Sequence, residues 1–256
     1  MIAFDTSQLS QWYGSVFWPL TRILALVAAA PLLSHRAIPL RAKVGIALAI
    51  TLAIAPAVAS PPLTGLLEAR GFVPLAQNIL VGLSLGFAVR LVFVAVELAG
   101  QLIGLQIGLS FGGYFNPDSG ESENAVSNFM SMLALLMFLA IDGHLMLLYA
   151  LADSFRLFPA GATGPIPIDP LTLVHAASEI FAIALTISLP ILAVMLLVNV
   201  VLGVMARVAP QLNLFAVGFP LTILAGLAAL TLFLPTLEGP LRAVLQRGVS
   251  MLPAAG

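Results

Sequence analysis

Long apolar runs separated by short polar stretches dominate this sequence. Six runs stand out, and their apolar residues do not alternate with polar ones as they would in a half-buried strand. Only helices and closed barrels satisfy their backbone groups inside lipid, and barrel strands alternate, so we expect every run to be helical. The runs cover approximately residues 13–33, 44–59, 74–109, 125–155, 171–207 and 212–234. The predicted fold class is therefore an all-α integral membrane protein of about six long, partly kinked helices arranged as hairpins.

Composition supports the membrane assignment. Of 256 residues, 61% are apolar and only 8% are charged, and the mean hydropathy is +1.10. A soluble domain has roughly 25% charged residues, so this chain has too little polar surface to coat a water-facing globule. A net charge of -1 and scattered basic residues give no nucleic-acid signal, and the absence of cysteine excludes disulfides and cysteine-bound metals.

Two of the runs are too long for a simple bundle. The third has about 36 residues and would reach ~54 Å as one helix, whereas the hydrocarbon core of a bilayer is about 30 Å thick. The fourth run is long as well. We therefore expect these helices to tilt, bend or extend into protein surroundings.

The last two runs are expected to form a kinked hairpin. They contain Pro190 and Pro220, and a proline inside a helix removes one backbone hydrogen bond. The turn between them is short and contains Arg207, Pro210, Gln211 and Asn213. A linker with four prolines and two glycines, residues 159–170, separates residues 1–158 from residues 171–256.

The segment 110–124 is the longest polar and glycine-rich interruption between two apolar runs. An ordinary solvated connector would need only a few residues and would rarely cluster aromatics. Aromatic side chains on a glycine-rich tether suggest a plug that can seal a pore, with an Asn-Pro turn beside them. The plug residues are Phe111, Gly112, Gly113, Tyr114, Phe115, Asn116 and Pro117.

Glycines spaced by four residues precede this segment. Gly100, Gly104 and Gly108 should lie on one side of the third helix and leave a strip of bare backbone. Such strips let helices approach closely in lipid. The sequence leaves open whether the partner is a helix of this chain or of another chain.

A few polar residues lie inside the apolar runs: Arg22, Arg90, Glu97, Asp142 and His144. A charge at the bilayer centre is costly, so each should face protein or water. Arg90 and Glu97 suggest either structural pairing or a solute path. Asp142 and His144 suggest either hydrogen bonding at a helix bend or an intramembrane hydrolase, but no catalytic motif accompanies them. We expect no enzyme, no metal site and no cofactor.

Several of these stretches together resemble the FliR family of the bacterial flagellar type III export gate. The resemblance lies in the Arg22 helix with the following Pro-Leu-Leu-Ser, in Gly86-Phe87-Ala88 with Arg90, and in residues 104–111. It continues through Asp142-Gly143-His144, and through Ala-Pro-Gln-Leu-Asn at 209–213 with Gly-Phe-Pro at 218–220. These stretches follow the order and spacing of that family over nearly the whole chain.

The resemblance implies a non-enzymatic subunit at the bacterial inner membrane, in the flagellar basal body. It would assemble with FliP and FliQ beside FlhB and FlhA, contact membrane lipid, and pass unfolded exported polypeptides. Residues 1–158 would correspond to FliP-like hairpins and residues 171–256 to a FliQ-like hairpin. The plug residues would help to close the channel. The main alternative is a small-solute secondary transporter with kinked helices around Arg90 and Glu97.

Overall fold

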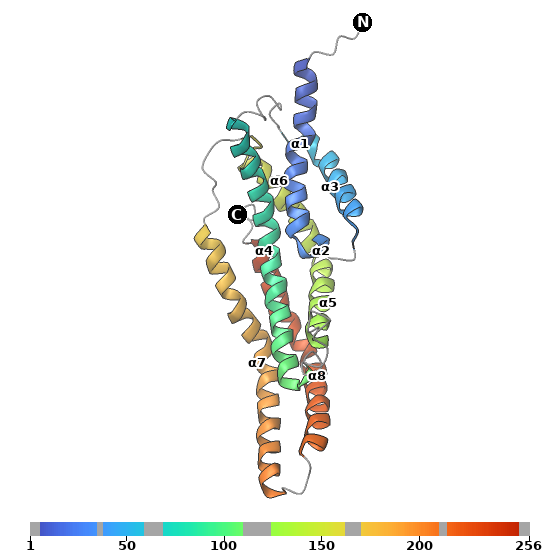
Figure 1. Ribbon diagram of the computed structural model, residues 1–256, viewed down its shortest axis with the longest axis vertical. Helices are drawn as coiled ribbons and strands as arrows, with labels where there is room; N and C mark the ends of the chain where they lie inside the picture. The colour runs from blue at the N-terminus through green and yellow to red at the C-terminus, as the bar shows by residue number, and fades with distance from the viewer. Residues whose placement is uncertain are drawn as a thin grey trace. The chain divides into compact units, whose positions relative to one another are not determined.

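A computed structural model describes residues 6–34, 38–58, 69–109, 124–161, 170–209 and 214–250, and its regular secondary structure in these ranges is entirely helical. Figure 1 labels the helices in chain order. They are α1 (Thr6–Ala29), α2 (Pro31–Ser34), α3 (Leu40–Ile54) with the 3-10 turn η1 (Ala55–Ala57), α4 (Ala69–Ile107), α5 (Ala125–Ala140), α6 (Gly143–Leu157), α7 (Pro170–Val208) and α8 (Leu214–Ser250). The all-α prediction is confirmed for the described residues.

Two predicted runs are each divided into two helices. The first is divided at Ala30, because the ring of Pro31 disfavours a helical conformation for the residue before it. The fourth is divided at Asp142, whose φ of 57° is left-handed. A left-handed residue interrupts the helical hydrogen-bond ladder, and Gly143 then begins α6. The fourth run is therefore interrupted at Asp142, which agrees with the bend that we expect as one alternative for this long run.

The final helix is longer than predicted. It continues past residue 234, through Pro235 and Pro240, to Ser250. Both α7 and α8 also continue through Pro190 and Pro220, so neither proline ends a helix. The kinks that we expect at these two residues remain a prediction.

The described helices include four that are long and apolar enough to cross a membrane, or up to five if α5 and α6 form one broken span. In the apolar 18-residue window of each span, the share of residues buried by the chain itself is 61% for Phe72–Ile107 of α4. The corresponding shares are 11% for Leu40–Ala57, 28% for Ala177–Val208 and 22% for Val217–Val244. Helix α4 is therefore the most enclosed of these four spans, while α3, α7 and α8 expose most of theirs.

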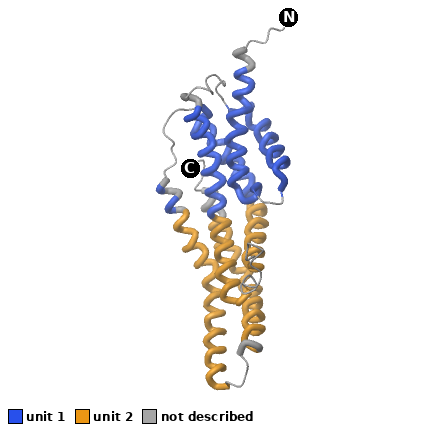
Figure 2. Tube along the Cα trace, viewed as in Figure 1, with its two compact units in different colours: residues 1–91, 142–176, 246–256 blue, residues 92–141, 177–245 orange. Residues whose placement is uncertain are grey.

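The chain forms two compact units (Figure 2). Unit 1 comprises residues 1–91, 142–176 and 246–256, and its core includes Ile23, Leu26, Leu85 and Leu151. Unit 2 comprises residues 92–141 and 177–245, and its core includes Ile103, Met130, Ile187 and Met195. The two units are defined by packing within the chain. The boundary predicted at residues 159–170 instead separates two segments that resemble different protein families. That division of the sequence remains a prediction.

Candidate functional site

The plug residues 111–117 lie outside the described residues, but the chain on either side of them is described. Helix α4 ends at Ile107, and the next residue, Gly108, has a φ of 94°. Glycine adopts this left-handed conformation without a steric penalty, which makes it a common residue at a helix C-terminus. The amide of Gly108 donates to the carbonyl oxygens of Gly104 at 3.1 Å and Leu105 at 3.2 Å. The segment 110–123 therefore begins at a well-capped helix end.

Asn124 caps the helix at the other end of this segment. Its Oδ1 accepts a hydrogen bond from the amide of Val126 at 3.0 Å, which satisfies a free donor in the first turn of α5. Its Nδ2 donates to the carbonyl oxygen of Gln101 on α4 at 3.3 Å. One side chain thus caps α5 and attaches it to α4.

Glycines on α4 make room for this attachment. A Cβ added at Gly100 would lie 2.6 Å from Cα of Ser127, and one added at Gly104 would overlap the side chain of Asn124. Ser127 Oγ also donates to the carbonyl oxygen of Glu97 at 3.0 Å. Gly100 and Gly104 therefore pack against the start of α5 within this chain.

We call the group Gly100, Gly104, Gly108, Asn124 and Ser127 the loop anchor. It lies within unit 2, and further packing holds its α4 side in place. Ile107 is fully buried, and its side chain occupies the space that a Cβ at Gly226 of α8 would need. The residues on both sides of the segment 110–123 are thus held by the packed helices α4 and α5.

A second polar group lies in unit 1 around Arg22, whose side chain is only 1% exposed. Its Nε donates to Asn78 Oδ1 at 2.7 Å, and one terminal nitrogen donates to the Ser154 carbonyl oxygen at 2.8 Å and Oγ at 3.1 Å. The other terminal nitrogen donates to the carbonyl oxygen of Phe158 at 2.7 Å. The guanidinium also lies 4.1 Å from the ring centroid of Phe155. We call these five residues the Arg22 cluster.

The Arg22 cluster joins α1, α4 and α6 through neutral acceptors. Asn78 Nδ2 donates to the carbonyl oxygen of Trp18 at 2.5 Å and to Thr21 Oγ1 at 2.7 Å, so the amide is satisfied on both sides. A Cβ at Gly82 would overlap the carbonyl oxygen of Arg22, which shows how closely α1 and α4 approach. A buried cation needs such hydrogen bonds to offset its lost hydration.

Sequence reasoning selected Arg22 but not its partners. Asn78 and Ser154 are 56 and 132 residues away from it along the chain. The available signal was that each is a polar residue inside an apolar run, as Arg22 is. Such residues are expected to find one another when the helices pack.

The other charged candidates are not brought together. Arg90 and Glu97 are both exposed on α4, and within the described ranges neither has an ion-pair partner. Asp142 is exposed, and its carbonyl oxygen accepts from the amides of Leu145 and Met146 at the start of α6. His144 is partly buried, with no hydrogen-bond partner at Nδ1 among the described residues.

The remaining candidates lie at the turn after α7. Arg207 is exposed in the last turn of that helix, where a cation is favourable beside the free carbonyl groups. Pro210, Gln211 and Asn213 lie outside the described residues. Within the part of the chain that the structure describes, no group of histidine and acidic residues could hold a metal ion.

Comparison with known proteins places this architecture in a family. Residues 13–248 match the family model described as bacterial export proteins, family 1. The flagellar biosynthetic protein FliR of Pectobacterium carotovorum subsp. carotovorum is 42% identical over 92% of this chain and 90% of the relative. FliR of Escherichia coli (strain K12) is 39% identical over the same shares, and FliR of Bacillus subtilis (strain 168) is 31% identical over 79% of each chain.

These matches cover nearly all the helices described above, including the Arg22 cluster and the loop anchor. They agree with a flagellar, membrane-embedded component of an export apparatus and with the prediction that the protein is not an enzyme. The chain belongs to family 1 of the bacterial export proteins, the family of the flagellar biosynthetic protein FliR.

Proposed function

We propose that this chain is a structural subunit of the flagellar type III export gate. It assembles with FliP and FliQ into a channel, beside FlhB and FlhA, at the flagellar basal body in the bacterial inner membrane. Unfolded polypeptides pass through the channel, and the plug residues 111–117 close it until export begins.

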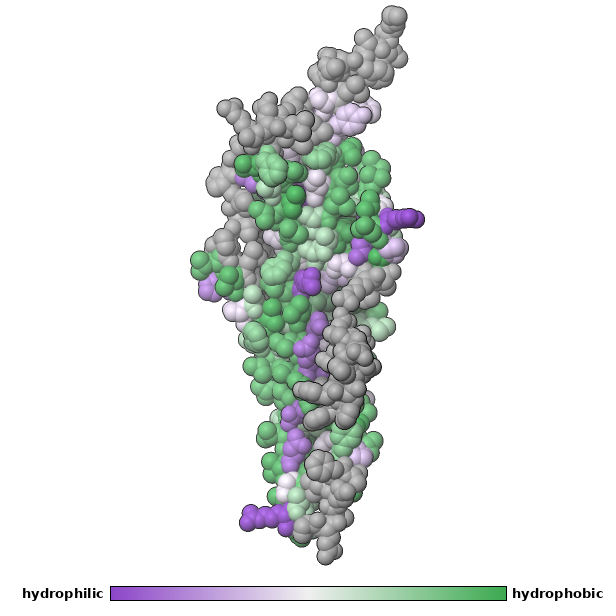
Figure 3. Space-filling model, in the orientation of Figure 1, coloured by the Kyte–Doolittle hydropathy of each residue, from purple (hydrophilic) through white to green (hydrophobic). Residues whose placement is uncertain are grey.

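The observation that carries this proposal is the exposed apolar surface of α3, α7 and α8. Among the residues coloured by hydropathy in Figure 3, hydrophobic ones predominate. On α7 the exposed large hydrophobic side chains include Leu189, Leu196, Leu197, Val200, Val201, Val204 and Val208. Lipid or the helices of sister subunits must cover such surfaces. Of the four candidate spans among the described residues, α4 alone has most of its apolar window enclosed by its own chain, which suits a subunit of a larger helical assembly.

The loop anchor supports the plug role. A plug must stay attached at a defined place while its tip moves aside. Gly108 and Asn124 fix the two ends of the segment 110–123 to α4 and α5. In this proposal, these contacts hold the two ends of the plug in place.

Deleting residues 112–115 tests the plug. We expect cells with the deletion to assemble the gate normally but to become permeable to ions and small solutes. The matched control removes residues 163–166 from the predicted linker, which shortens the chain equally and should leave the membrane tight. An intact permeability barrier in correctly assembled deletion gates would contradict the plug role.

Purification from native membranes tests the assembly. A tagged copy of the chain should retain FliP and FliQ through purification in mild detergent. A chain that purifies as a stable monomer without either protein would contradict the proposed assembly, whatever the result of the deletion.

A further inference from the structure

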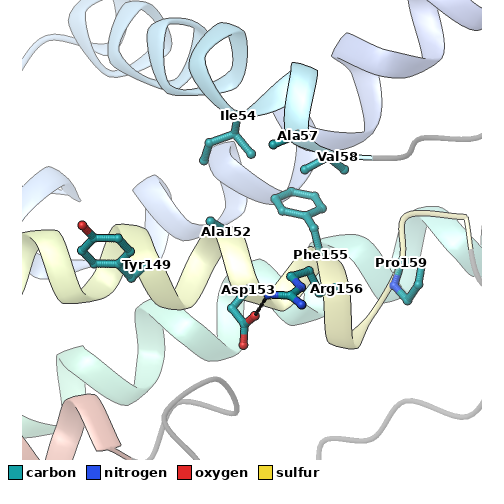
Figure 4. A pocket seen from close by; sticks show the side chains of 9 residues that line it. All are labelled: Ile54, Ala57, Val58, Tyr149, Ala152, Asp153, Phe155, Arg156 and Pro159. Atoms are coloured by element: carbon teal, nitrogen blue, oxygen red, sulfur yellow. Dashed lines mark ion pairs between the residues drawn. The ribbon is translucent and has the colours of Figure 1, made fainter.

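Unit 1 contains a partly open pocket of about 530 Å³ that neither the Arg22 cluster nor the loop anchor explains (Figure 4). Its wall on one side is the end of α3 with η1, and on the other side α6. The apolar lining residues are Ile54, Ala57, Val58, Ala152, Phe155 and Pro159. Pockets of this size can enclose a large part of a small amphipathic ligand.

The pocket lies at the end of a candidate membrane span. Ile54 and Ala57 belong to the last turn of the span Leu40–Ala57, only 11% of which is buried by this chain. The end of a span is where the hydrocarbon core meets the lipid headgroups. Tyr149, which also lines the pocket, is 75% exposed, and exposed tyrosines are typical of this interface.

Opposite charges lie beside each other along the same pocket. Asp153 and Arg156 are separated by one helical turn, with their side chains 3.8 Å apart. They are 37% and 86% exposed, so both can exchange their weak mutual contact for a ligand. In Figure 4 the ring of Phe155 points toward Ala57 and Val58, and a dashed line joins Asp153 and Arg156 on the same helix. The pocket thus combines an apolar surface with one anionic and one cationic group.

We propose that this pocket binds a phospholipid with a zwitterionic phosphoethanolamine headgroup. Arg156 binds the phosphate, Asp153 accepts hydrogen bonds from the primary ammonium group, and an acyl chain covers Ile54, Val58 and Phe155. The arrangement favours this headgroup over two others. Phosphoglycerol has no cation for Asp153, and the quaternary ammonium of phosphocholine has no N–H to donate.

Native mass spectrometry of the full-length protein, purified with any subunits that remain bound, tests the proposal. The protein is exchanged into detergent containing phosphatidylethanolamine, phosphatidylcholine or phosphatidylglycerol with identical acyl chains, and retained lipids are counted. We expect phosphatidylethanolamine to be retained preferentially. Arg156→Gln and Asp153→Asn should each weaken its retention about tenfold or more, the equivalent of one charge-assisted hydrogen bond. Arg242→Gln, which removes an exposed arginine from α8 outside the pocket, should have no effect.

A substitution that fills the pocket tests the apolar part of the site independently of its charged residues. Ala57 is exposed at the pocket wall, so Ala57→Trp should block the acyl chain and abolish selective retention without unfolding the protein, as checked by thermal melting. Equal retention of all three lipids, or stronger retention of phosphatidylglycerol, would overturn the headgroup assignment. Pocket variants that release FliP or FliQ without changing lipid retention would show that a protein partner occupies the pocket, and would also overturn it.

Discussion

The Arg22 cluster should be a major source of stability in unit 1, and Arg22→Met tests this directly. Methionine fills a similar volume but cannot donate hydrogen bonds. The substitution leaves Asn78 Oδ1 and the Phe158 carbonyl oxygen without the donor that Arg22 provides. The Ser154 carbonyl oxygen also loses Arg22 but still accepts from the amide of Phe158 at 2.9 Å. The buried position, with 1% exposure, keeps water from replacing them.

The magnitude follows from the two acceptors that lose this donor, Asn78 Oδ1 and the Phe158 carbonyl oxygen. An unsatisfied buried acceptor costs about 1–3 kcal/mol in soluble proteins, whereas interhelical hydrogen bonds in membranes average about 0.6 kcal/mol. Losing the guanidinium also removes its desolvation cost, which offsets part of the penalty. We therefore expect Arg22→Met to lower the free energy of unfolding by about 2–4 kcal/mol.

Unfolding by a denaturing detergent in mixed micelles, followed by circular dichroism, measures this difference. Arg242→Met is the matched control, because Arg242 is an exposed arginine on α8 that belongs neither to the Arg22 cluster nor to the pocket. Arg22→Lys should be intermediate, since one ammonium group cannot reach all three acceptors in the geometry of the guanidinium fork. A stability for Arg22→Met within about 0.5 kcal/mol of the Arg242→Met control would refute the reasoning.

Three further substitutions probe the helix contacts. Gly100→Ala should destabilise unit 2 by about 1–3 kcal/mol because its Cβ would collide with the backbone of Ser127. The control Gly203→Ala, whose added Cβ has open space, should leave stability unchanged. Equal melting temperatures for the two variants would contradict this prediction. Asn124→Ala should cost about 1 kcal/mol through loss of the cap and speed hydrogen exchange in the first turn of α5; unchanged exchange there would count against the cap. Asp142→Gly should preserve or raise thermal stability by relieving the left-handed backbone, whereas Asp142→Val should lower it by at least about 1 kcal/mol; the opposite order would be inconsistent with the observed φ.

Much of the fold could be predicted because hydropathy alone distinguishes this chain from a soluble protein. The helices α3, α4 and α7 begin and end within a few residues of their predicted bounds, since polar or proline-rich stretches flank them. The break at Asp142 was harder to predict, because apolar residues continue on both sides. The only local signal was Asp-Gly, a pair that is common in turns.

The extent of α8 was missed for a different reason. Prolines usually mark helix ends in water, but Pro235 and Pro240 both lie inside α8. In membrane helices, neighbouring groups can satisfy the backbone acceptors that a proline frees. We therefore predicted too short a helix by treating proline as a helix end, as in soluble proteins.

Of the candidate sites, sequence reasoning identified single residues better than their contacts. Arg22 stood out as a charge in an apolar run, but its partners come from two distant helices that only tertiary packing brings close. For the glycine strip, the pattern indicated a close approach of helices without naming the neighbour. The contacts of Gly100 and Gly104 with the start of α5 depend on how α4 and α5 pack, which no local pattern specifies.

The use of carbonyl, amide and hydroxyl oxygens around Arg22 has a consequence for how the protein responds to its surroundings. An arginine keeps its proton at every physiological pH, and none of the groups that it contacts can be neutralised by acid, as a carboxylate would be. Burial also shields the contacts from dissolved ions. The hydrogen bonds by which Arg22 joins α1, α4 and α6 should therefore persist when acidity or ionic strength differs between the two sides of a membrane.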